Sequence, residues 1–252
     1  MIFASNDFSD AIDFIFHKRE SVSGNVKVGG SELIGLAEHH LLLSAVAVLA
    51  ACVVAMPLGL YLGHIGRGEF LAISVSNIGR AVPSLALLAF FIAYIGIGFQ
   101  NIALVLFLLA VPPILTNTYV ATRQVNPSTV DAARGIGMSE RQIVQKVELP
   151  LGLATIFGGI RTSTVNVFAT ATIAPLASYD TLGTPIISSN VYGFSGTLGA
   201  AIVVAALTLA IDGGLALVQR AVTPKGVRLG RGATAGRGKF WAIRLRRGEQ
   251  VT

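Results

Sequence analysis

Charged residues are scarce in this chain, and their scarcity excludes an ordinary soluble domain. Lysine, arginine, aspartate and glutamate make up 13% of the 252 residues, whereas a soluble domain carries about 25%. Hydrophobic residues make up 53%, the mean hydropathy is +0.70, and the apolar residues form long blocks. A helix needs such blocks to cross a lipid bilayer. We therefore predict an all-α, polytopic helical membrane protein with about five transmembrane helices.

Catalytic and metal-binding signatures are also lacking. The one cysteine, Cys52, cannot form a disulfide within the chain, so cysteine usage says nothing about the cellular compartment. No cluster of histidines and cysteines resembles a metal site, and nothing pairs a serine with a histidine as nucleophile and base. No G-x-x-x-x-G-K-[ST] loop is present. We expect no metal, no cofactor and no enzyme activity here, so any ATP hydrolysis must come from another protein.

The first part of the chain, residues 1–40, does not look like a secretory signal peptide, because aspartates stand where a basic region would be. Four apolar residues fall at helical spacing, and they are Phe8, Ala11, Ile12 and Ile15. This spacing predicts a short amphipathic helix at the membrane surface. Residues 21–30 predict a loop, and residues 31–40 predict a second amphipathic stretch. We expect 1–40 to form an external or interfacial segment.

Five apolar stretches have the length of membrane-spanning helices, or nearly so. They are 41–63, 76–97, 101–119, 153–177 and 198–218. Gly59 and Gly63 in the first stretch form either a helix-packing seam or a frayed helix end. Pro112 and Pro113 in the third stretch predict a kink. A polar external loop is expected over 178–196, between the last two stretches.

The longest polar run between apolar stretches is 131–150, and it predicts two short helices. Pro127 suits the first position of the first helix, with Asn126 or Ser128 as its N-cap. Gly137 is placed to end that helix in a left-handed turn.

The second of these helices is expected to begin at Ser139. Gln142 lies three residues further on, which is the spacing of a capping box. Pro150 is expected to end the helix, because proline disrupts a helix interior.

Polar residues gather in the stretch 153–177, which contains Arg161 followed by a run of hydroxyl and amide side chains. The run comprises Thr162, Ser163, Thr164, Asn166, Thr170 and Thr172. Such side chains line a water-filled path, bond their own helix backbone or join neighbouring helices. Arg161 has either a structural or gating role, or extends towards the water surface. Asp212 is expected to pair with a cation near the inner surface.

Basic residues set the expected orientation of the five spans. Fourteen of the 19 lysines and arginines fall on the side that holds 131–150 and the C-terminal tail, whereas Lys18, Arg19 and Lys27 fall on the other side. The positive-inside rule therefore places the N-terminus outside and the C-terminus in the cytoplasm. The basic tail, 220–252, is expected to be disordered and to reflect topology or lipid contact rather than nucleic-acid binding.

The polar run resembles the loop with which permeases of ABC importers dock onto their ATPase, whose pattern is E-A-A-(x3)-G-(x9)-I-x-L-P. The matching residues are Asp131, Ala132, Ala133, Gly137, Val147, Leu149 and Pro150. Aspartate replaces the glutamate, and valine replaces the isoleucine. The resemblance implies a type I importer domain over 41–219 with a cytoplasmic coupling loop. It also implies that the small alanines allow close approach of a partner helix.

Several further segments resemble permeases for osmoprotectants such as glycine betaine, carnitine and choline. They are 80–88, 112–119, 131–139, 147–151 and 159–162. The resemblance implies four kinds of partner: two ABC ATPase subunits, a second permease subunit that is identical or a sister chain, an extracytoplasmic substrate-binding protein and the lipid membrane. Residues 178–183 depart from the family's G-A-G-G-L-G pattern. The resemblance therefore does not say how the outer face of this chain contacts a binding protein.

We interpret the chain as the permease subunit of an ATP-driven importer of a compatible solute. Arg161, Asn166, Thr170 and Thr172 are its candidate path or gate residues. An ABC permease for amino acids or another small solute is the alternative from the same class. A stand-alone secondary transporter would need ion-coupling carboxylates at mid-membrane, for which Asp212 is the candidate. A membrane scaffold would leave the polar run unexplained.

Overall fold

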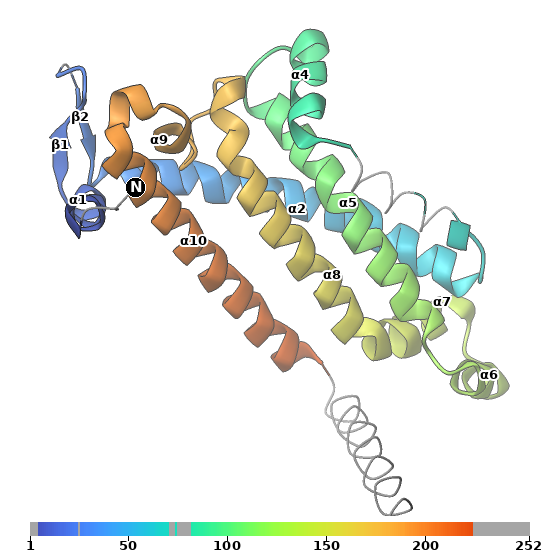
Figure 1. Cartoon of the computed structure of the whole chain (residues 1–252). Helices are drawn as coiled ribbons and strands as arrows, with labels where there is room; N and C mark the ends of the chain where they lie inside the picture. The colour runs from blue at the N-terminus through green and yellow to red at the C-terminus, as the bar shows by residue number, and fades with distance from the viewer. Residues whose placement is uncertain (1–4, 25, 71–73, 75–81, 224–252) are drawn as a thin grey trace, which may run out of the picture.

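The computed structural model describes residues 5–24, 26–70, 74 and 82–223, and in these the regular structure is helical apart from one hairpin (Figure 1). Four described segments are long and apolar enough to cross a bilayer. They are α2 (Glu32–His64), α5 (Phe99–Arg123), the run Glu140–Ala177 that contains α8 (Leu149–Thr170), and α10 (Ser189–Val222). The predicted class, an all-α polytopic membrane protein, is confirmed.

The fifth expected span, 76–97, is described only in part. Its described portion contains α4 (Ser84–Ile95), an apolar helix of 12 residues. A helix of that length is about 18 Å long and is too short to cross about 30 Å of hydrocarbon. Residues 76–81 lie outside the described residues.

Helix α5 is the centre of the bundle, since α2 and α8 both pack along it. The core is made of fully buried aliphatic side chains from these helices, which include Leu43, Ala51, Ile102, Leu106, Ile114 and Val167. Helix α10 packs on α8 and α1 but contributes few buried residues, and its Leu209 is 74% exposed. The outer surface of α10 is therefore apolar and free to meet lipid or another chain.

Gly59 and Gly63 lie where α2 packs most closely against α5. A Cβ on Gly59 would lie 2.8 Å from the Cβ of Thr118, and one on Gly63 would lie 2.6 Å from the Cβ of Thr122. Small residues let two helix backbones approach in this way. The pair is therefore a packing seam and not a frayed helix end. The helix α5 also extends past the expected end at 119, to Arg123.

The N-terminal segment forms α1 (Ser5–Phe16) and a hairpin of β1 (Lys18–Glu20) and β2 (Lys27–Gly29). The amphipathic helix is confirmed, but its buried face centres on Ala11 and Phe14, whereas Phe8 is 60% exposed. A loop was expected over 21–30, but Lys27–Gly29 within this range forms strand β2. Strands of three residues are too short to show an alternating pattern, so the pairing has no sequence signal.

The hairpin is tied to α1 by an ion pair. Arg19 donates to Asp13 at 2.8 Å and to the hydroxyl of Ser195 at 2.9 Å. The hydrogen bond from Arg19 lowers the pKa of the Asp13 carboxyl below its usual value. Hairpin, α1 and the start of α10 thus form one unit at one end of the bundle (Figure 1).

Two expected helix boundaries are wrong. Helix α2 begins at Glu32 rather than at 41, because the polar His40 finds a partner inside the bundle: its Nε2 donates to the Phe168 carbonyl at 2.8 Å. The polar loop expected over 178–196 is shorter, since α9 (Thr184–Ile187) and α10 occupy much of it. Gly193, with φ of 69°, breaks the first part of α10 without ending it.

Candidate coupling surface and translocation path

The polar run folds as α6 (Pro127–Gly135) and α7 (Glu140–Ile143), at the end of the bundle opposite the hairpin (Figure 1). Asn126 is the N-cap of α6, because its side-chain oxygen accepts from the backbone N–H of Ser128 at 2.9 Å. Pro127 occupies the first turn. Gly137 has φ of +85°, so the predicted left-handed stop is confirmed.

The capping box that starts α7 is confirmed as well. Ser139 N–H donates to Gln142 Oε1 at 2.9 Å, and Gln142 N–H donates to Ser139 Oγ at 3.4 Å. We refer to residues 127–148, from α6 to the end of the turn described next, as the polar segment.

Pro150 was expected to end the second helix, but it does not. Helix α7 continues through a π-helical turn, Val144–Glu148, directly into α8, whose first turn holds Pro150. Proline cannot donate to the helical ladder, and the Leu149 N–H before it bonds the Val144 carbonyl in the wider π pattern, so the irregularity falls where Pro150 would disturb a regular α-helix. The polar segment is therefore rigidly continuous with a membrane-spanning helix.

The motif residues fall into two groups in the structure. Asp131, Ala132 and Gly137 are exposed, and no described atom lies within 4 Å of a Cβ built on Gly137. Beside them Ile136 is 80% exposed, which sequence reasoning missed although an apolar residue in a polar run is a signal of contact. Ala133 is buried beneath this surface.

The other group lies where the polar segment joins α8. Val147, Leu149 and Pro150 are half-buried there. They contribute packing at the joint, whereas the exposed group forms a surface that a partner can reach.

A chain of alternating charges crosses the polar segment. Arg134 bonds Asp131 at 3.3 Å and both oxygens of Glu140 at 2.9 and 3.1 Å. The hydrogen bonds to Glu140 raise the pKa of the Arg134 guanidinium. His64, the last residue of α2, then joins Glu140 at 3.0 Å and the buried Glu148 at 2.9 Å. Sequence reasoning missed the contacts of His64 because His64 is far from Glu140 and Glu148 in the chain.

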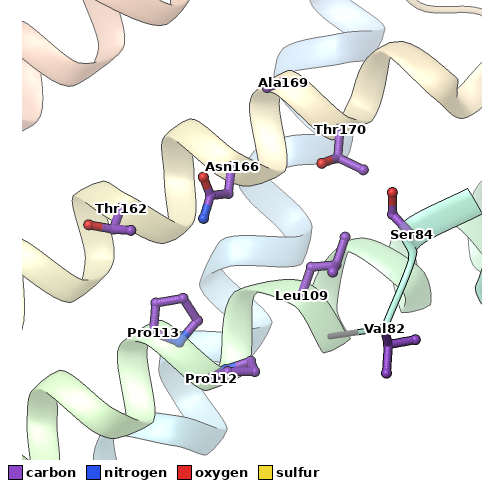
Figure 2. A pocket seen from close by; sticks show the side chains of 9 residues that line it. All are labelled: Val82, Ser84, Leu109, Pro112, Pro113, Thr162, Asn166, Ala169 and Thr170. Carbon is purple, nitrogen blue, oxygen red and sulfur yellow. The ribbon is translucent and has the colours of Figure 1, made fainter. Parts of the chain in front are cut away.

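A cavity of about 460 Å³ lies between α5, α8 and the start of α4 (Figure 2). Its lining residues are Val82, Ser84, Leu109, Pro112, Pro113, Thr162, Asn166, Ala169 and Thr170. The side chains of Asn166 and Thr170 point from α8 towards α5 and Ser84 (Figure 2). The structure therefore places two of the predicted path residues, Asn166 and Thr170, at one cavity whose lining side chains are uncharged.

A second cavity, also of about 460 Å³, adjoins the first. It is lined by Gly158, Arg161, Thr162, Val165, Asn166 and Asp212. Thr162 and Asn166 line both cavities. Thr172, the remaining predicted path residue, lines neither of these two cavities. It lies in the 3-10 helical stretch Ala171–Ala177 that follows α8, and its hydroxyl donates to the Ala169 carbonyl three residues before it, at 2.7 Å.

Arg161 does not extend freely towards the water surface. Its guanidinium makes a two-pronged ion pair with Asp212 of α10, at 2.9 and 2.7 Å. Gln219 accepts from the same guanidinium at 3.2 Å and donates to the Ala154 carbonyl at 2.7 Å. The expected pairing of Asp212 with a cation is confirmed. The pair joins α8 to α10, at the edge of the second cavity.

Comparisons with known proteins agree with this fold. Residues 55–224 match the family described as binding-protein-dependent transport system inner membrane component. The chain is 38% identical over 204 residues to the glycine betaine/carnitine/choline transport system permease protein OpuCB of Bacillus subtilis (strain 168), which covers 81% of this chain and 94% of that protein. It is 36% identical over 203 residues to the carnitine transport permease protein OpuCB of Listeria monocytogenes, over 80% and 93% of the two chains.

A solved structure shows the same fold. "Inward facing conformations of the MetNI methionine ABC transporter: CY5 native crystal form" aligns with a TM-score of 0.66, over 76% of this chain and 96% of that chain, at 21% identity.

Proposed function

The chain belongs to the family of binding-protein-dependent transport system inner membrane components, and from this premise we propose that it is the membrane subunit of an ABC importer for glycine betaine, carnitine, choline or a similar compatible solute. The observation that carries the substrate class is the 38% identity to the osmoprotectant permease of B. subtilis, which extends over 94% of that protein. The uncharged lining of the first path cavity, between α5, α8 and the start of α4, suits a small solute whose charges balance or are dispersed.

Importers of this family work with an ATPase and a substrate-binding protein, so this multi-pass plasma-membrane chain is one part of an assembly. We propose two ATPase subunits, a second permease copy or sister chain, and a binding protein on the outer face. The exposed group of Asp131, Ala132, Ile136 and Gly137 supports an ATPase docking surface, because its backbone and small side chains are open to a partner. ATP hydrolysis then belongs to the partner, since this sequence has no Walker loop.

Uptake by membrane vesicles tests the function. Vesicles that contain this chain and its copurifying partners are expected to accumulate labelled glycine betaine, carnitine or choline when ATP is supplied inside. Methionine is the control solute, because a MetNI-like specificity would accumulate it instead. Accumulation of methionine alone would contradict the osmoprotectant proposal, and uptake without ATP or an ATPase would contradict an ABC importer.

The orientation is a second prediction. We expect the hairpin outside and the polar segment in the cytoplasm, because fourteen basic residues fall on the one side and three on the other. A reporter fused at Gly24, in the hairpin, is expected to be active only outside, and one fused at Gly236 only inside. Activity of both fusions on the same side would contradict an odd number of spans.

A further inference from the structure

His64 occupies a position that the motif does not account for. It is the last residue of α2, and its two ring nitrogens face carboxylates from two other elements. Nδ1 lies 2.9 Å from Glu148 Oε2 in the π turn, and Nε2 lies 3.0 Å from Glu140 Oε2 in α7. The side chains of His64 and Glu148 are 12% and 5% exposed. A buried carboxylate without a partner is costly, so this contact is more than a surface ion pair.

The backbone that carries His64 is held in place. The preceding residue, Gly63, lies against α5 so closely that a Cβ on it would be 2.6 Å from the Cβ of Thr122. The imidazole therefore has a fixed base on α2 and α5, while its two partners belong to the polar segment. No chain connection other than the long route through α4 and α5 joins α2 to that segment, so the ring is a direct link between them.

The link depends on the protonation of the ring. A neutral imidazole has one N–H and donates to one carboxylate, whereas the imidazolium has two N–H groups and donates to both. Arg123 of α5, and Asp131 and Arg134 of α6, line the cavity of about 210 Å³ beside the ring.

We propose that the charged form of His64 fastens the polar segment to α2, so that a displacement of α6 and α7 is carried into α2 as well as into α8. His64 is then a positioning residue for the coupling of ATP hydrolysis to transport. This proposal rests on the importer function proposed above. It assigns a role to an α2 residue that lies outside the motif residues named above.

Three variants separate the role of the charge from that of the shape. His64→Ala removes both contacts. His64→Arg keeps a permanent cation with several donors, and the 210 Å³ cavity beside the ring gives the longer side chain room. His17→Ala is the matched control, because His17 bonds Asp13 at 2.8 Å on an exposed surface beside the hairpin, at the opposite end of the bundle.

The measurement is the amount of solute imported per ATP hydrolysed, in vesicles with copurified ATPase. We expect the ratio to fall roughly fivefold in His64→Ala, at the lower end of the usual range for coupling between sites. The ratio should stay at the parental value in His17→Ala, and His64→Arg should keep most of it because its guanidinium can still donate to both carboxylates.

A second measurement does not depend on transport. Backbone hydrogen exchange in residues 140–148 of the purified full-length chain should become faster in His64→Ala but not in His64→Arg. Parental exchange and parental coupling in His64→Ala would overturn the proposal, as would equal losses of coupling in His64→Ala and His17→Ala. If the parent imports no solute but exchange responds as expected, the importer function fails and the link stands.

Discussion

Replacement of Gly183 by alanine is expected to prevent the chain from folding, although only one methyl group is added. A Cβ at this position would lie 1.8 Å from the carbonyl oxygen of Thr172 and 2.5 Å from its carbonyl carbon. Gly183 has φ of −73°, which any residue adopts, so the obstacle is space and not backbone conformation.

The neighbouring residues leave the backbone no room to withdraw. Thr181 and Leu182 are fully buried, and the Thr181 hydroxyl donates to the Ala171 carbonyl at 3.1 Å. Overpacking a core costs about 1–3 kcal/mol when side chains can adjust. Here the opposing atoms are backbone, so we expect the cost to exceed that range.

The measurement is the yield of membrane-inserted, monodisperse protein after detergent extraction, with its thermal midpoint. Gly35→Ala is the matched control, because no described atom lies within 4 Å of a Cβ built there. We expect parental yield for the control and almost none for Gly183→Ala. Equal midpoints for the two variants would show that the 178–183 corner is less tightly packed than the structure has it.

Removal of the Asp212 carboxylate is expected to have the second largest effect. Asp212→Ala leaves the Arg161 guanidinium in a membrane-spanning helix without its ion-pair partner. An unpaired charge in a spanning helix costs about 2.5–3.5 kcal/mol on insertion scales. Since the two side chains are 31% and 35% exposed at an open cavity, we expect a measurable destabilisation that lies below that range.

The double variant Arg161→Ala with Asp212→Ala should recover most of the lost stability, because it leaves no charge behind. Thr208→Ala is the matched control on α10, since that hydroxyl bonds only within its own helix in the described structure, to the Val204 carbonyl at 2.7 Å. The thermal midpoint gives stability, and vesicle uptake gives function. If Asp212→Ala were as stable as Thr208→Ala, the ion pair would not hold α8 to α10.

Uptake by the double variant separates two roles of this pair. Recovered stability with recovered uptake would mean that the pair only joins two helices. Recovered stability without uptake would mean that its charges also act on the cavity that Asn166 and Thr162 share with them.

The amino-acid sequence by itself determined the features that depend on neighbours along the chain. Long uncharged stretches are enough to predict membrane helices, because the bilayer requires each backbone polar group to be satisfied within its own segment. The caps at Asn126 and Ser139 and the left-handed stop at Gly137 were predictable because they too are local features. Each is a contact between residues no more than three positions apart, or a conformation of one residue.

Only the tertiary structure decided the features that depend on distant partners. Pro150 was expected to end a helix, but the π turn before it lets the helix continue. The polar His40 was expected to lie before the first span. It lies buried within α2 instead, where its side chain bonds the Phe168 carbonyl of α8.

The candidate site shows the same division. The two short helices of the polar segment were predictable, whereas the contacts of His64 with Glu140 and Glu148, and of Gly183 with Thr172, have no local pattern. Hydrogen bonds and steric contacts act over a few ångströms in space, whatever the separation of their residues along the chain. A residue whose role depends on such a contact therefore gains that role only when the helices have packed.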